Sequence, residues 1–329
     1  MQEQRTKLAA SPSGGSVRAR SFPKGFCKRF AKVAGNACMR QTILVAFSAV
    51  VLTACITVPQ GVRERTSDSG DAVPAPVACH PGTPEHVVTS RTSSVSRTLD
   101  PNGFRLLNWN GFKGESHRWL KAFAQYSDGQ DLVTLQEAYL TDDLRALLGR
   151  RGLQWDLATA FRKQQHAAGV MTLSRITPDQ VCVQRTLEPW LLLPKSTLIS
   201  RFRFEGQERA LLVANIHSVN FTLGTAEFRD QLSQLAYLLK HYDGPIILAG
   251  DFNTWNDERV EVLEETLIDP LSLEKVHFDP RRLRTVFEHN LDYVFFRGLS
   301  VVAHEARETR VSDHNPMWVT FKSVMEKSN

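Results

Sequence analysis

Short apolar runs of strand length recur along the chain between Phe104 and Phe321, and segments with helical spacing lie between some of them. Val, Ile, Leu, Phe and Tyr are frequent in these runs, which is typical of β-strands. The runs predicted as strands span residues 104–109, 131–137, 169–174, 197–204, 210–217, 245–251, 291–296 and 316–321. This mixture extends over about 225 residues and predicts one α/β domain of layered sheets and helices.

Two segments between these runs carry helix signals. Four large apolar residues recur at helical spacing and predict one face of a helix over roughly residues 224–241; they are Phe228, Leu232, Leu235 and Leu239. Thr225 is the candidate N-cap of this helix. Thr141 precedes two aspartates and the run LRALLGR. Because acids in a first turn interact favourably with the helix dipole, a second helix is predicted to begin there.

Charge is distributed unevenly along the chain. Residues 1–40 contain nine Lys or Arg and one acid, Glu3, whereas residues 41–329 contain 31 basic and 34 acidic residues. The formal net charge of +5 therefore belongs to the N-terminal segment. Binding of nucleic acid through bulk charge needs a basic folded domain, and this composition does not support it.

An apolar run ends at Cys55. Residues 39–55, MRQTILVAFSAVVLTAC, place Arg40 before about a dozen mostly apolar residues. A helix that spans a bilayer core of about 30 Å needs about 20 apolar residues, so the run fits a signal peptide better. The stretch Leu52–Cys55 resembles the lipobox of bacterial lipoproteins, which implies translation from Met39, lipidation of Cys55 and a membrane-anchored envelope protein that faces the periplasm. The alternative is a buried or interfacial helix in a cytoplasmic protein.

The segment between this signal and the first predicted strand has the composition of a linker. Residues 56–102 are rich in Pro, Gly, Ser and Thr and show no hydrophobic period. We therefore divide the chain into a basic leader and signal segment (1–55), a flexible linker (56–102), a folded domain (103–323) and a short tail (324–329).

Cysteine usage adds one open question. The chain has five cysteines, and Cys79 and Cys182 would remain in the mature protein beside the lipidated Cys55. An oxidising compartment would allow these two to form a disulfide. The sequence leaves open whether they do.

The stretch IILAGDFN, residues 246–253, delivers an acid and an amide at the end of a predicted buried strand. Side chains two residues apart share one face of a strand, so Asp251 and Asn253 are expected to point the same way. Gly250 permits close approach of the backbone. A buried carboxylate is costly unless it meets a cation, hydrogen-bond donors or a reaction. The alternative is a strand end that Asp251 caps through an Asx-turn.

Polar residues also follow or begin other predicted strands. These residues are Asn110, Glu137, His217, Asp292, and the pair Asp313 and His314. Each has an ordinary explanation, such as a turn residue or a core histidine with satisfied hydrogen bonds. Because they recur at strand ends within one domain, we expect a common site.

Their order and contexts carry a family resemblance. The motifs WN, LQE, NIHSVN, GDFN, LDYVF and SDHNP, spread over roughly residues 104–322, resemble the endonuclease/exonuclease/phosphatase superfamily, and in particular its YafD-like bacterial branch. The superfamily includes pancreatic-type deoxyribonucleases, abasic-site endonucleases, bacterial sphingomyelinases and inositol-polyphosphate phosphatases. The resemblance implies a DNase-I-like fold, a four-layer α/β sandwich of two packed mixed sheets flanked by helices.

By this resemblance, Glu137 is the principal Mg²⁺ (or Mn²⁺) ligand, Asp313 lies close to the ion, and Asn110 supports the metal end. Mg²⁺ is usually held by one or two carboxylates together with water and substrate phosphate, so a sparse ligand set is reasonable.

The same resemblance gives roles in the reaction. Asp251 would hold the attacking water, and Asn253 would fix that geometry and help to bind the phosphoryl oxygens. His314, oriented by Asp292, would act on the nucleophile or stabilise the negative phosphorane-like state, and the sequence does not decide between these roles. His217 and Asn220 match the family positions that contact the scissile phosphate.

One departure from the family pattern argues against specificity for abasic sites in DNA. Abasic-site endonucleases carry an acid two residues after the first-motif Asn, where this chain has Phe112. The hypothesis is a monomeric metal-dependent phosphoester hydrolase, with an endonuclease or other phosphodiesterase activity. The alternatives are an enzyme for phospholipid head groups or small phosphoesters, and an envelope binding protein without activity. An apolar rim with exposed aromatic side chains around the site would favour lipid, and a Lys/Arg groove would favour nucleic acid.

Overall fold

The computed structural model describes residues 56–59, 63–66, 72–74 and 98–324. Met39, Cys55 and Cys79, which carry the expectations on processing and pairing, lie outside these residues. Cys182 is disulfide-bonded, and the four other cysteines of the chain all fall outside the described ranges. Within those ranges, no helix is long and apolar enough to cross a bilayer.

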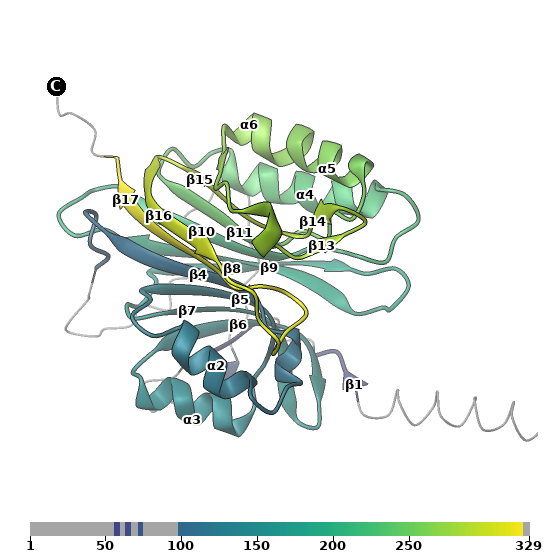
Figure 1. Cartoon of the computed structure of the whole chain (residues 1–329), viewed down its shortest axis with the longest axis horizontal. Coiled ribbons are helices and arrows are strands. Elements are labelled where there is room, and N and C mark those ends of the chain that lie inside the picture. The colour runs from purple at the N-terminus through teal and green to yellow at the C-terminus, as the bar shows by residue number, and fades with distance from the viewer. Residues whose placement is uncertain (1–55, 60–62, 67–71, 75–97, 325–329) are drawn as a thin grey trace, which may run out of the picture. The chain divides into compact units, whose positions relative to one another are not determined.

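Two mixed sheets face each other and form the inner layers of the fold (Figure 1). In spatial order, the larger sheet contains β16 (Leu299–Ala306), β17 (Met317–Ser323), β4 (Phe104–Asn110), β5 (Leu132–Tyr139), β7 (His166–Ser174), β6 (Gln154–Lys163), β2 (Arg63–Thr66) and β3 (Ala72–Pro74), and β1 (Ile56–Thr57) also pairs with β6. The smaller sheet contains β12 (Glu274–Lys275), β15 (Asp292–Arg297), β11 (Ile246–Asp251), β10 (Ala210–His217), β9 (Pro194–Arg203) and β8 (Gln180–Leu187). A separate hairpin is formed by β13 (Thr285–Val286) and β14 (His289–Asn290).

Helices cover the outer face of each sheet and complete four layers (Figure 1). The larger sheet carries α2 (Trp119–Tyr126) and α3 (Asp142–Arg150), and the smaller sheet carries α4 (Ala226–Leu239), α5 (Asp257–Leu263), η2 (Glu264–Ile268) and α6 (Asp269–Leu271). The 3₁₀ turns η1 (Phe112–Gly114) and η3 (Pro280–Arg282) lie in connecting loops. The predicted four-layer α/β sandwich is confirmed.

Each interface between layers is an apolar core. Between the sheets, Phe104, Phe202 and Phe321 are at most 1% exposed and pack with aliphatic side chains from both sheets. Full burial of one such side chain stabilises the fold by about 1.5–3 kcal/mol. A second cluster joins the larger sheet to α2 and α3, and a third joins the smaller sheet to the helices that cover it.

A small polar network also joins the two sheets. Nε2 of Gln136 in β5 donates hydrogen bonds to Oδ1 of Asn108 at 3.0 Å and to Oδ1 of Asn215 in β10 at 2.6 Å. Nδ2 of Asn215 donates in turn to the carbonyl of Met171 at 2.8 Å. Asn108, Gln136 and Asn215 are all fully buried. Since an unpaired buried amide is costly, this network disfavours sliding of one sheet on the other near the ends of β5 and β10.

The last strand of the chain, β17, lies inside the larger sheet between β16 and β4. β17 pairs antiparallel with β4, from Met317 opposite Asn108 to Phe321 opposite Phe104. The connection between β16 and β17 contains Asp313 and His314. The tertiary fold therefore brings the C-terminal motif beside the first one.

Every run predicted as a strand overlaps a strand of the structure, and both predicted helices are present. Thr141 is the N-cap of α3, where its hydroxyl accepts a hydrogen bond from the amide of Leu144 at 3.2 Å. Thr225 precedes α4 but forms no capping bond, because its hydroxyl donates to Glu258 at 3.0 Å. The prediction missed β6, β8 and β16, whose polar and apolar residues alternate incompletely, and the two-residue strands β12, β13 and β14.

The segment predicted as a flexible linker differs from that expectation where it is described. Parts of residues 56–102 form β1, β2 and β3, and both β1 and β2 pair with β6. An exposed sheet edge offers unpaired backbone groups to any extended segment, so its partner does not need an apolar period. The low hydrophobicity of this segment therefore did not indicate its pairing.

Candidate active site

A cavity of about 390 Å³ opens where the carboxyl ends of β5, β10 and β11 meet. Its lining includes seven of the nine residues predicted for the site: Glu137, His217, Asn220, Asp251, Asn253, Asp313 and His314. The other two, Asn110 and Asp292, lie behind the lining and hydrogen-bond to Asp251 and His314, respectively. The structure thus brings together all nine predicted residues of the folded domain.

Asp251 is buried at the end of β11, and its two carboxylate oxygens have different partners. Oδ1 accepts the backbone N–H of Asn253 at 3.0 Å, which is the Asx-turn that the sequence left open. Oδ2 accepts a hydrogen bond from Nδ2 of Asn110 at 2.9 Å and lies 3.5 Å from Nε2 of His217. The turn and a role in the site are therefore compatible. Burial raises the pKa of Asp251 to about 6, although the nearby charge of His314 acts in the opposite direction.

Gly250, the residue before Asp251, allows the backbones of β10 and β11 to approach each other closely. Its φ is 152°, and a Cβ atom there would lie 1.9 Å from the carbonyl oxygen of Ile216 in β10. Only glycine fits this position without movement of the backbone.

His314 and Asp292 form a buried charged pair beside Asp251. Nδ1 of His314 lies 2.6 Å from Oδ2 of Asp292, and Nε2 lies 3.9 Å from Oδ2 of Asp251. Burial alone would lower the pKa of His314, but the carboxylates of Asp292 and Asp251 outweigh it and raise the pKa to about 10. His314 is therefore an imidazolium at neutral pH. It has the right charge to stabilise negative charge on a phosphoryl group, and it is a poor general base.

The same cluster has the spacing of a metal site. Asp251, Asp292 and His314 each offer one ligand atom, and these atoms lie within 4.8 Å of one another. In the structure these atoms face one another, with Nδ1 of His314 on Asp292 and Nε2 towards Asp251, so a metal ion bound here would have to replace the proton and these contacts. Without an ion, the cluster places a positive charge beside Asp251.

Glu137 and Asp313 offer the carboxylates that a divalent cation prefers. Glu137 lies at a β-bulge in β5 with φ of 50°, an unusual conformation for a residue other than glycine, and its carboxylate lines the cavity. Its Oε2 is paired with the ammonium group of Lys113, which shows that a cation can be held there. Asp313 is exposed and lines the same cavity. Oxygen donors with access to water fit Mg²⁺ or Mn²⁺.

Asn110 contacts the carboxylate of Asp251. Its Nδ2 donates to Asp251, and its Oδ1 accepts the backbone N–H of Phe112 at 3.1 Å. Asn110 therefore positions Asp251, and its support of the metal end stays a prediction.

His217 faces a lysine that the sequence did not single out. Nζ of Lys195 in β9 lies 2.7 Å from Nε2 of His217. Burial and the charge of Lys195 lower the pKa of His217 well below its usual value, so the imidazole is neutral and its Nε2 accepts from the ammonium group. Burial also lowers the pKa of Lys195, against the opposing effect of nearby carboxylates that include Glu188 and Asp251. The cavity therefore contains a lysine with the charge and reach to bind phosphate.

Asn220 and Asn253 are held by buried charged side chains that also escaped prediction. Glu188 is fully buried, and its Oε1 accepts the backbone amides of Asn220 at 2.7 Å and Phe221 at 2.8 Å. Arg259 is fully buried as well, and its Nε donates to the carbonyl of Asn253 at 2.7 Å. These contacts fix the two loops that carry the asparagines.

The signals for these residues were weak in the sequence. Lys195 is a lone cation in the apolar stretch LLLPKSTLIS, and the predicted strand began after it. Arg259 and Glu188 have the appearance of ordinary surface charges. Only tertiary packing reveals that they are buried.

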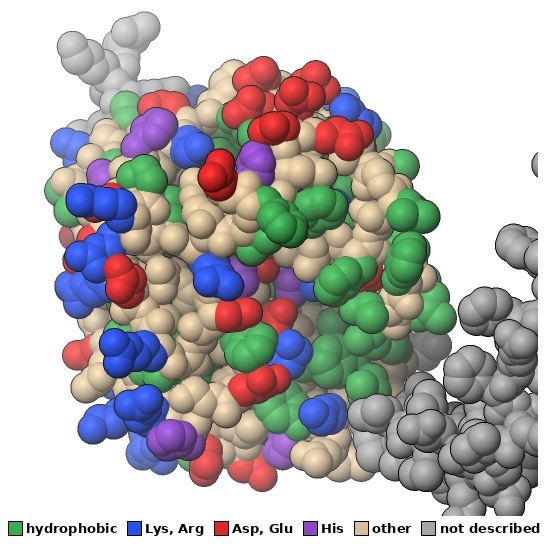
Figure 2. Space-filling view, turned by 45° about the vertical axis from the view of Figure 1, so that its right-hand side comes forward, with side chains coloured by type: hydrophobic (Ala, Val, Ile, Leu, Met, Phe, Trp, Pro, Cys, Tyr) green, Lys and Arg blue, Asp and Glu red, His purple; other side chains and the backbone are tan. Residues whose placement is uncertain are grey.

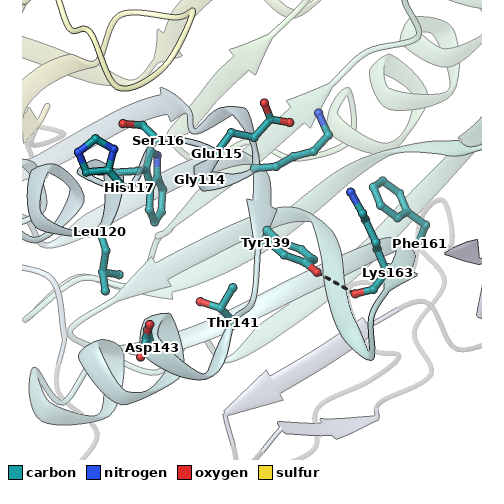
Figure 3. A pocket seen from close by; sticks show the side chains of 12 residues that line it. Gly114, Glu115, Ser116, His117, Leu120, Tyr139, Thr141, Asp143, Phe161 and Lys163 are labelled. Atoms are coloured by element: carbon teal, nitrogen blue, oxygen red, sulfur yellow. Dashed lines mark hydrogen bonds between the residues drawn. The ribbon is translucent and has the colours of Figure 1, made fainter. Parts of the chain in front are cut away.

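A second depression of about 410 Å³ adjoins the cavity and shares Lys113 and Phe161 with it. Tyr139, Phe161 and Lys163 line one side, and Ser116 and His117 line the other (Figure 3). The hydroxyl of Tyr139 donates to the carbonyl of Lys163 at 2.8 Å. The site therefore extends along the end of the β6–β7 hairpin.

Comparison with known proteins assigns the family. A model described as the endonuclease/exonuclease/phosphatase family matches residues 106–314. The chain belongs to the endonuclease/exonuclease/phosphatase family. A UPF0294 protein of Vibrio vulnificus is 39% identical over 237 residues, which cover 71% of this chain and 83% of that protein.

Solved structures of this family share the fold. An endonuclease/exonuclease/phosphatase from Beutenbergia cavernae superposes with a TM-score of 0.55 at 19% identity, covering 68% of this chain and 72% of that one. The catalytic domain of human Nocturnin gives a TM-score of 0.54 at 20% identity, covering 69% and 97%. The DNase-I-like fold and the bacterial branch implied by the motifs are thereby confirmed. Membership of this family indicates hydrolysis of phosphoester bonds, and its enzymes typically depend on a divalent metal.

Proposed function

We propose that this chain is a divalent-metal-dependent phosphodiesterase that cleaves a P–O bond by in-line attack of water. The observation that carries the proposal is the set of side chains around the Asp251 carboxylate. Its Oδ2 faces the cavity floor between Asn110, His217 and His314, and its raised pKa of about 6 makes it a base of moderate strength. A catalytic base with a pKa near the working pH is the most effective.

In the proposed reaction, the water oxygen forms a bond to phosphorus, and the bond to the leaving oxygen breaks. The leaving group departs as an alkoxide and takes up a proton from solvent. The proton of the water passes to Oδ2 of Asp251. The His314 imidazolium and the Lys195 ammonium lie in the cavity where negative charge would develop on the phosphoryl oxygens. Preorganised charges of this kind are usually the largest contribution to catalysis in phosphoryl transfer.

Glu137 and Asp313 would hold the metal. When bound, a Mg²⁺ or Mn²⁺ ion supplies positive charge to the phosphoryl group. Glu137 is paired with Lys113 in the structure, so metal binding requires the lysine to release this carboxylate. The side chain of Lys113 is 38% exposed, so its ammonium group can be solvated when it releases Glu137.

The proposed location is the cell envelope, with a lipid anchor at Cys55. Two observations support it: the lipobox-like sequence before Ile56 and the disulfide of Cys182, a bond that is formed mainly in oxidising compartments.

The test of the function uses the purified full chain with bis(p-nitrophenyl) phosphate and a panel of DNA, RNA, phospholipid and inositol-phosphate substrates. We expect hydrolysis with Mg²⁺ or Mn²⁺ and none after chelation. Asp251→Asn should remove the activity, and Asp230→Asn, an equivalent change at an exposed position of α4, should not. Turnover that persists after exhaustive chelation would contradict the metal dependence. A native-like Asp251→Asn variant with full turnover would show that the site is misplaced.

A further inference from the structure

Large apolar side chains are exposed beside the mouth of the cavity. They come from the end of β8, the loop that follows it and the loop between β10 and α4: Leu187, Trp190, Leu191, Leu192, Phe221 and Leu223. We call these six residues the apolar rim. Trp190 is 65% exposed and Leu223 is 79% exposed. Figure 2 shows hydrophobic side chains gathered beside a hollow on one face, with charged side chains more dispersed around them.

The rim belongs to the mouth of the site. Leu191 and Phe221 line the cavity itself. Across the mouth, Val286 lines the cavity and the next residue, Phe287, is 79% exposed at the tip of the β13–β14 hairpin. Apolar side chains from three loops therefore border the cavity. Contiguous exposed apolar surface of this kind marks a docking site more often than chance.

A buried carboxylate holds the rim in place. Glu188 accepts hydrogen bonds from the amides of Asn220 and Phe221, and so ties the loop after β8 to the loop after β10. The amide of Leu192 donates to the Glu188 carbonyl at 2.9 Å, and the Glu188 amide donates to the Leu193 carbonyl at 3.0 Å. The exposed apolar side chains are thus presented on ordered turns.

The rim carries no surface charge over either loop. Between Leu187 and Leu193 the only ionisable residue is Glu188, which is buried, and residues 219–224 contain none. Tight binding of a nucleic-acid backbone needs Lys and Arg at the contact surface. The lining of the cavity contains two lysines, Lys113 and Lys195. A lining with cations beside an apolar rim matches a phosphate group that bears an apolar tail.

The N-terminal end of the described chain lies on the same side. Ile56 and Thr57 form β1 and pair with Lys163 and Arg162, near Phe161 of the cavity lining. The carbonyl of Pro59 accepts a hydrogen bond from Nη1 of Arg185 at 3.3 Å, two residues before Leu187 in β8. The apolar run that predicts a lipid anchor ends at Cys55, directly before Ile56. A short tether would consequently hold the mouth of the cavity against the bilayer.

We propose that the apolar rim docks on a phospholipid bilayer and that the substrate is a phospholipid whose head-group phosphodiester enters the cavity while its acyl chains remain in the membrane. Amphipathic surfaces bind at the interface by burying apolar side chains among the head groups and upper acyl chains. The substrate class rests on the proposed hydrolase function. The docking surface stands on the exposed residues and the position of β1.

Docking is tested first, without any measurement of activity. The full chain is mixed with phosphatidylcholine vesicles whose acyl chains carry bromine, which quenches tryptophan fluorescence on contact. Trp190 is 65% exposed, whereas Trp109, Trp119 and Trp155 are buried and Trp255 and Trp318 are half-buried. We expect quenching in the wild type and a large reduction of it in Trp190→Phe. If Trp190→Phe is quenched as strongly as the wild type, the rim does not enter the bilayer and the proposal fails.

The substrate class is tested by two rates of hydrolysis, one for phospholipid in vesicles and one for soluble bis(p-nitrophenyl) phosphate. The measured quantity is the first rate divided by the second. The variant Trp190→Ser/Leu192→Ser should lower this ratio by about tenfold or more, because it removes apolar contact with the interface. Val302→Ser changes an exposed apolar residue of β16 and should leave the ratio unchanged.

The outcomes separate the two proposals. Quenching of Trp190 without hydrolysis of either substrate would contradict the hydrolase function and leave docking supported. Hydrolysis of the soluble diester or DNA without quenching would contradict docking and leave the hydrolase supported. A rim variant that converts a dimer into a monomer in sedimentation, with no quenching in the wild type, would identify the rim as a contact between copies and overturn the proposal.

Discussion

The Nζ atom of Lys195 lies 2.7 Å from Nε2 of His217, deep in a cavity that also contains Glu137 and Asp251. This pair joins β9 to the end of β10. It gives the site a cation that no sequence motif predicted. We expect Lys195→Met to lower kcat/KM for a phosphodiester by roughly two orders of magnitude, because a charge on the phosphoryl oxygens is lost. Steady-state kinetics of a variant with a native circular dichroism spectrum measure this.

The pH dependence distinguishes a charged role of Lys195 from a packing role. Burial lowers its pKa below 10.5, so the ammonium loses its proton earlier than a free lysine as the pH rises. If the charge is needed, activity falls on the alkaline side at that lowered pKa. Lys195→Arg should move the alkaline limb to higher pH, since a guanidinium stays charged. Equal alkaline limbs in the two proteins would contradict this role.

Asp251 and His314 should behave as one unit. Each of Asp251→Asn and His314→Ala should lower kcat by roughly two to four orders of magnitude with little change in KM. The double variant should be little worse than the poorer single one, because both groups act on the same displacement at phosphorus. Fully additive losses would show that the two groups act independently.

Metal binding should become tighter when the competing ammonium is removed. Lys113 is paired with Glu137 in the structure, and a partly exposed ion pair contributes up to about 1 kcal/mol. Lys113→Met should therefore lower the Kd for Mn²⁺ by up to about fivefold. Calorimetric titration of the protein without substrate checks this. Glu137→Gln should weaken binding in the same assay, and an unchanged Kd in Glu137→Gln would exclude this residue as a ligand.

Gly250→Ala should destabilise the fold strongly. The added Cβ atom would lie 1.9 Å from the Ile216 carbonyl, at a backbone φ of 152°. Overpacking together with a strained φ predicts a loss of roughly 3 kcal/mol or more in the free energy of unfolding. Gly149→Ala is the matched control, because a Cβ there meets nothing within 4 Å and the residue lies in α3. This control should be neutral or stabilising by up to about 1 kcal/mol, as urea unfolding would show.

Continuous apolar runs predicted the central strands of this α/β domain because β4, β5, β10 and β11 are buried on both faces. The four-layer arrangement was implied by the family resemblance. Polar side chains at the ends of these strands predicted the site, because a buried carboxylate is costly unless it has a partner. The strands β1, β2 and β16, which lie at or next to the ends of the larger sheet, could not be predicted, because free backbone groups decide their pairing.

The supporting residues of the site were hidden for a different reason. Lys195, Glu188 and Arg259 each have one local context that looks ordinary, and their importance comes from contacts with distant segments. The Asx-turn at Asp251 shows a further limit. The sequence left the turn and the site as alternatives, whereas in the structure one carboxylate oxygen of Asp251 forms the turn and the other faces the site.

The pairing of β17 with β4 also determines when the protein can become active. β4 is among the first strands of the domain to be synthesised, and its partner is the last, with more than 200 residues between them. Asp313 and His314 precede that final strand, so the chemistry is incomplete until almost the whole chain has left the ribosome. A chain that lacks its last strand therefore lacks two of the side chains that line the cavity. The order of the strands makes assembly of the candidate site one of the last steps in folding.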